Sequence, residues 1–63
     1  MVDDPQIART ALGMKRIFKD EAASECLLLM ERFRRRDDLG GLRVWESIYQ
    51  AVRRLEEERR LIE

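Results

Sequence analysis

The chain has 63 residues, enough for one domain near the lower size limit of a self-supporting core. Hydrophobic residues make up 44% of it and charged residues 41%, so few positions remain for long loops. Thirteen basic residues balance thirteen acidic ones, whereas nucleic-acid-binding proteins usually carry a positive excess. The composition predicts closely packed helices and argues against nucleic acid as the main partner.

The cysteine usage and the apolar runs predict a cytoplasmic protein. Cys26 is the single cysteine, so no disulfide can form within the chain. The first five residues are acidic and lack the apolar stretch of a secretory signal. The longest apolar run, residues 26–30, is far shorter than a membrane span requires. We therefore expect no membrane partner.

The first predicted helix covers residues 5–18. Asp4 can cap its free amides, and Pro5 at the first helical position loses no hydrogen bond. Gly13 lies inside this helix, where glycine costs roughly 1 kcal/mol relative to alanine. Either it admits a close neighbouring helix, which we favour, or it is a tolerated weakness. The apolar stripe has helical spacing and consists of Ile7, Ala11, Met14 and Phe18.

The second predicted helix covers residues 21–36. Asp20 can cap it, which indicates a tight turn at 18–20, although one long continuous helix is the alternative. Cys26 falls on its apolar face, so we expect a buried structural thiol that reacts slowly. The three arginines at 34–36 lie in the last turn, where cations favour the helix dipole.

The third predicted helix covers residues 38–62 and follows the clearest break, at residues 37–41. Asp38 is its expected cap, and Gly41 and Trp45 lie one turn apart. We expect the Trp45 indole to lie over Gly41 at the centre of the core. Short connections predict an all-α fold with a single domain over 1–63. The predicted architecture is a small three-helix bundle, packed antiparallel or orthogonally.

The sequence offers no pattern that a catalytic site requires. It has no histidine, the commonest general base and metal ligand. Its paired carboxylates at 3–4, 37–38 and 56–58 are explained by helix caps and solvated faces. No phosphate loop, nucleophile elbow or metal-ligand spacing is present. We expect a protein that is not an enzyme and that has no cofactor, metal or small-molecule substrate.

The arginine-rich segments 32–36 and 53–60 leave two interpretations open. The first is a helix-turn-helix-like DNA-binding regulator in which the third helix enters the major groove. The acidic residues of that helix would repel phosphates. The second interpretation, which we favour, is solvated helix faces with ion pairs such as Glu31–Arg35 and Glu56–Arg60.

Several apolar residues do not fit the core stripes and indicate either a surface for another chain or a wide stripe that faces two neighbouring helices. Leu28 falls opposite the Cys26 face, and Leu42 and Tyr49 lie at the edge of the stripe of the third helix, which consists of Val44, Ile48, Ala51, Val52 and Leu55. The third helix, about 36 Å long, should overhang its shorter neighbours and end in Leu61 and Ile62. So small a core often needs a partner. We expect a protein-interaction module or regulator, adaptor- or inhibitor-like, that binds another protein or itself as a homodimer.

The segment 38–48 has the spacing Asp-x-x-Gly-x-x-x-Trp-x-x-Ile, after two short helices. In this it resembles a family of very short alphaproteobacterial proteins of unknown function. The resemblance covers roughly residues 7–55. It implies a helical fold and a bacterial cytoplasmic setting, and it implies no activity.

Overall fold

The computed structural model describes the backbone of residues 4–62 and the side chains of residues 4–59. No strand occurs in this part of the chain, which confirms the all-α class. Its elements, in chain order, are the α-helix α1 (Pro5–Phe18), the 3₁₀ turn η1 (Lys19–Glu21), and the α-helices α2 (Ala22–Arg35) and α3 (Leu39–Ile62). The predicted helix limits were therefore correct to within one residue.

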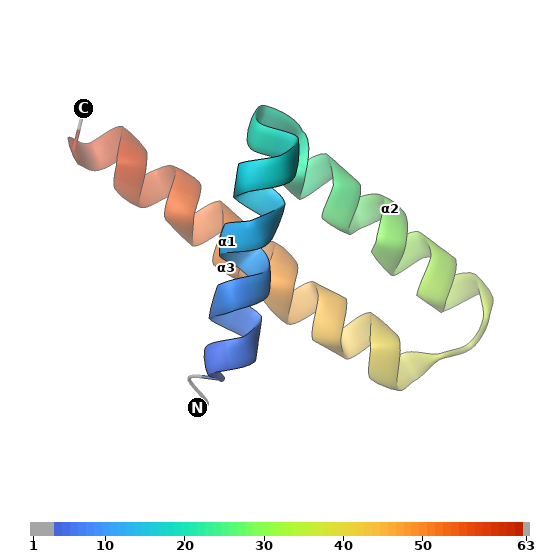
Figure 1. Ribbon diagram of the computed structural model, residues 1–63. Coiled ribbons are helices and arrows are strands. Elements are labelled where there is room, and N and C mark those ends of the chain that lie inside the picture. Colours follow the sequence, from blue (N-terminus) through green and yellow to red (C-terminus); the bar gives the residue numbers. More distant parts are fainter. Residues whose placement is uncertain (1–3, 63) are drawn as a thin grey trace.

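The helices form a hairpin that is crossed by α1 (Figure 1). α2 and α3 run side by side in opposite directions, and α1 crosses the middle of α3 instead of running along it. Both α1 and α2 pack on α3, whereas they touch each other much less. The prediction is therefore correct for a helical fold with short connections. It is not correct for a bundle of three mutually packed helices, because α1 and α2 both pack on α3 and only slightly on each other.

A tight turn separates α1 from α2, which excludes the single long helix. The Asp4 carboxylate caps α1 by accepting a hydrogen bond from the amide of Gln6 at 2.9 Å. At the other end of α1, Lys19 takes φ 52° and ψ −118°, a conformation that turns the chain. Lys15 donates a hydrogen bond from Nζ to the Lys19 carbonyl at 3.2 Å. This hydrogen bond stabilises the turn.

The turn between α2 and α3 is a Schellman motif. The amide of Asp38 donates to the carbonyl of Phe33 at 3.0 Å, and that of Asp37 donates to Arg34 at 3.1 Å. Asp37 takes the left-handed position with φ 58°, where glycine is usual. The Asp38 carboxylate then accepts a hydrogen bond from the amide of Gly41 at 2.9 Å. Asp38 is therefore the cap of α3, as predicted.

The core is small, with six of the described residues buried in it. Its largest fully buried side chains, among those described, are Val52 and Cys26. The burial of Cys26 confirms the predicted register of the second helix. Each α-helix contributes two buried residues to the core: Ala11 and Met14, Ala22 and Cys26, Ile48 and Val52.

Two packing predictions were wrong. Trp45 is only partly buried at the edge of the core, and the ring nearest Gly41 is that of Phe33. A Cβ atom on Gly41 would lie 2.6 Å from Cε1 and 3.1 Å from Cγ of Phe33. The hairpin causes this, because it brings the end of α2 onto the start of α3. At Gly13 a Cβ would meet nothing within 4 Å, so no close neighbour explains that glycine.

Candidate protein-interaction surfaces

Large apolar side chains are unusually exposed in this molecule. Six of those described are between 48% and 72% exposed, although single exposed apolar residues are ordinary in monomers. They lie on all the α-helices: Leu12, Ile17, Leu27, Leu28, Leu39 and Val44. Among the described residues, the chain thus exposes as many large apolar side chains as it buries residues in its core.

The shape of the molecule explains this exposure. Its backbone measures 40 × 26 × 16 Å, so the molecule is flat and elongated. It exposes 5387 Å² to solvent, whereas a compact monomer of 7.6 kDa exposes about 4,300 Å². The excess is about 1,100 Å². This is somewhat more than the roughly 800 Å² that each partner buries in a standard protein interface.

The residues predicted to form a partner surface differ in exposure. Leu28 is 59% exposed on the face of α2 turned away from the core, as expected. Leu42 is half-buried at the start of α3. The half-buried Tyr49 packs against the core, and its hydroxyl accepts a hydrogen bond from Arg53 Nη1 at 3.0 Å. The Arg53 guanidinium also lies 5.9 Å from the centre of the Tyr49 ring. Tyr49 therefore belongs to the fold more than to a free surface.

The end of α3 overhangs the rest of the molecule. α3 has 24 residues and is about 36 Å long, whereas α1 and α2 have 14 residues each and are about 21 Å long. Figure 1 shows the last turns of α3, in orange and red, extending past α1. The overhang is as predicted. The side chains of Leu61 and Ile62, the last two residues of the predicted surface, lie outside the described residues.

An open groove of about 720 Å³ lies between the first turns of α1 and one face of α3. We call it the α1/α3 groove. Its apolar part comes from both helices, and two arginines lie on the α3 side; the residues used below are Ile7, Ala8, Val44, Ala51, Arg43 and Arg54. The groove is not among the predicted surfaces. Its signal in the sequence is the seven-residue spacing of Val44 and Ala51, which periodicity alone places in the core stripe of the third helix.

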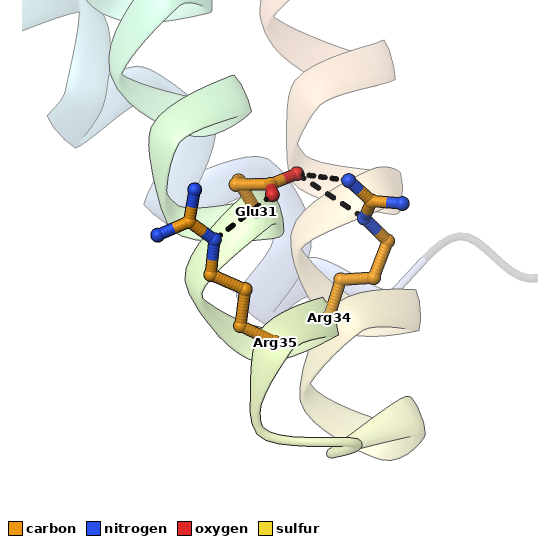
Figure 2. A network of polar contacts seen from close by, with 3 residues as sticks. All are labelled: Glu31, Arg34 and Arg35. Carbon is orange, nitrogen blue, oxygen red and sulfur yellow. Dashed lines mark hydrogen bonds and ion pairs between the residues drawn. The ribbon is translucent and has the colours of Figure 1, made fainter.

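The arginines at the end of α2 are partly neutralised within the helix (Figure 2). Arg34 donates to one oxygen of the Glu31 carboxylate from Nη2 at 2.6 Å and Nε at 3.1 Å, and Arg35 Nε donates to the other at 3.1 Å. The hydrogen bonds from Arg34, and then the one from Arg35, lower the pKa of the Glu31 carboxyl below its ordinary value. The predicted Glu31–Arg35 pair is therefore confirmed.

A second carboxylate links α1 to α3. Glu56 Oε2 lies 3.2 Å from Lys15 Nζ, and Glu56 Oε1 lies 3.7 Å from Arg53 Nε. The predicted partner of Glu56, the side chain of Arg60, lies outside the described residues. Because Lys15 and Glu56 are both largely buried, this ion pair helps to fix how α1 crosses α3.

The antiparallel hairpin differs from the arrangement that DNA-binding proteins of the helix-turn-helix type use. In that motif the two helices meet at about 90–120°, so that the second can enter the major groove. Here α2 and α3 lie alongside each other (Figure 1). The arginines of the turn are thus placed at one end of a hairpin.

The described residues contain no group of three side chains from histidine, cysteine, aspartate and glutamate that could hold a metal ion. Among them, no helix is both long and apolar enough to cross a membrane. Burial, and then the charge of Glu25, raise the pKa of the Cys26 thiol, which keeps it protonated at neutral pH.

No protein-family model, curated protein or solved structure matches this chain. The resemblance to short alphaproteobacterial proteins therefore stays a prediction that rests on the spacing in residues 38–48.

Proposed function

We propose that this chain is a non-enzymatic helical protein-interaction module, of the adaptor or inhibitor kind, that acts by binding another protein chain or a second copy of itself. The observation that carries the proposal is the amount of exposed apolar side chain: six large apolar residues are 48–72% exposed, as many as the described residues buried in the core. Apolar surface that so small a chain cannot bury by itself can be covered by a partner chain.

The energetics favour one interface of ordinary size. Burying about 800 Å² on each partner, of which some 60% is apolar, contributes about 24 kcal/mol at 25 cal/mol per Å² over both chains. Association itself costs about 4–15 kcal/mol, and ordering side chains adds to that cost. A single such interface is therefore sufficient for stable binding, whereas the exposed residues taken singly are not.

The α1/α3 groove is the surface best suited to a partner. It is concave, and Val44, 48% exposed, and Ala51 offer apolar contact along one helix face. Arg43 and Arg54 lie at its edge and make no ion pair within the described part of the chain. An apolar centre with charged residues at the rim is the usual composition of a binding surface.

The test measures two properties of each variant: the size of the complex that the chain forms in a cell extract, and the free energy of unfolding of the purified chain. We expect the tagged chain to migrate in a fresh cell extract at more than its monomer mass, and Val44→Lys to reduce that fraction strongly. The variant should change the free energy of unfolding by less than about 1 kcal/mol, because Val44 is half exposed. Glu46→Lys, at an exposed site on another face of α3, is the control.

Migration of the parent chain at its monomer mass would contradict the proposal. So would an unchanged complex with Val44→Lys. The alternative function, a DNA-binding regulator, predicts a salt-dependent shift of duplex DNA by the purified chain. Absence of that shift at low salt would exclude the alternative.

A further inference from the structure

α3 carries a second stripe along the α1/α3 groove, which shares Ala51 with the residues that pack against the core. The stripe residues are three and four positions apart in alternation, the spacing at which one helix meets another along its length. They are Val44, Ser47, Ala51, Arg54 and Glu58. Ser47 and Ala51 at its middle are small, so a second helix can approach closely there.

In one orientation of two α3 helices, the charged residues on this face of one copy can pair with those of the other copy. Arg43 and Glu58 lie almost equally far along α3 from Ala51, in opposite directions. When two copies of α3 lie antiparallel about a two-fold axis near Ala51, Arg43 of each copy is therefore beside Glu58 of the other. Arg43 and Glu58 are both exposed, and neither takes part in an ion pair between described side chains.

The same orientation uses the overhang. The last turns of α3 extend past α1 (Figure 1), and in the antiparallel arrangement they lie along the first turns of α3 in the other copy. Those first turns hold Val44 and one end of the α1/α3 groove. Each overhang thus covers the groove of the other copy. Because both copies use the same surface, the contact forms a closed dimer to which no further copy is added.

The chain exposes enough surface for such a contact. Each copy exposes about 1,100 Å² more than a compact monomer of its mass, and a standard interface buries about 800 Å² on each side.

We infer that the occupant of the α1/α3 groove is a second copy of this chain, held in an antiparallel α3–α3 dimer with its two-fold axis near Ala51. This inference rests on the proposed function, of which it names the partner. It fixes the register of the two helices, since Arg43 of one copy pairs with Glu58 of the other. By symmetry each dimer contains two such pairs.

Sedimentation equilibrium of the purified full-length chain tests the inference through charge reversal. We expect a dimer at micromolar concentration. Arg43→Glu and Glu58→Arg should each raise the dimer Kd about tenfold or more, because each places like charges together twice. The double variant R43E/E58R restores opposite charges and should return the Kd to within about threefold of the parent. Arg32→Glu, the same charge reversal at an exposed site on α2, should leave the Kd unchanged.

A monomeric parent chain up to about 500 μM would overturn the inference, as would a double variant that stays as weak as the single ones. Circular dichroism of each variant separates these results from unfolding. The proposed function is tested separately in cell extract. A purified monomer that still forms a large complex in extract overturns the dimer and leaves the proposed function standing, with another protein as partner. A monomer in both settings overturns both.

Discussion

The contact between Gly41 and Phe33 allows one prediction to be worked out in energetic terms. Replacing a helical glycine by alanine usually stabilises a helix by about 0.8–1 kcal/mol, because alanine loses less backbone entropy. At Gly41 the new Cβ would lie 2.6 Å from Cε1 and 3.1 Å from Cγ of Phe33. Since Cγ lies near the base of the side chain, the whole ring must move. Overpacking of this kind costs typically 1–3 kcal/mol.

Gly13→Ala provides a matched control. Gly13 is also within a helix and has a negative φ, but a Cβ there meets nothing within 4 Å. We therefore expect Gly13→Ala to stabilise the chain by about 0.8–1 kcal/mol, and Gly41→Ala to be neutral or to destabilise it by up to about 2 kcal/mol. The difference between the two variants, about 1–3 kcal/mol, measures the clash with Phe33.

Urea unfolding followed by circular dichroism at equal protein concentration gives both values. In the background of Phe33→Leu, which removes the ring, Gly41→Ala should become as favourable as Gly13→Ala. If Gly41→Ala stabilised the parent chain as much as Gly13→Ala does, Phe33 would not pack on Gly41, and the described α2–α3 hairpin would be incorrect.

Three further predictions concern the turns, a carboxylate and the thiol. Lys19→Gly should stabilise the chain by about 1–2 kcal/mol in urea unfolding, because Lys19 has φ 52° and ψ −118°, which a side chain rarely adopts. Asp37→Gly should raise the free energy of unfolding by only about 0.5–1 kcal/mol, because aspartate tolerates the left-handed region at φ 58°. By NMR, Glu31 should titrate below the ordinary glutamate pKa, and Arg34→Gln should raise that pKa. The lowered pKa adds stability that is present above about pH 4.3 and is lost as the pH falls through the folded-state value. Cys26 should react with a thiol reagent only as fast as the chain opens, so rapid labelling of the native protein would contradict its burial.

The local signals in the sequence were sufficient for the starts of α1 and α3. The predicted cap Asp20 was wrong, because it lies within the 3₁₀ turn and α2 begins at Ala22 without a side-chain cap. A capping carboxylate and a proline mark the start of α1, and Asp38 marks the start of α3, because these groups act on amides within a few residues. The burial of Cys26 and the exposure of Leu28 also follow from periodicity, since a helix fixes which residues share a face.

Only the tertiary structure decided which side chain meets which. Periodicity places Trp45 and Phe33 on inward faces, but the shift of α2 along α3 determined that Phe33 contacts Gly41. That α1 crosses α3, with the Lys15–Glu56 ion pair at the crossing, likewise depends on residues far apart in the chain. The α1/α3 groove arises from the same crossing. The sequence alone determined the faces of the helices, whereas their relative position, which no local pattern encodes, determined the neighbours and the groove.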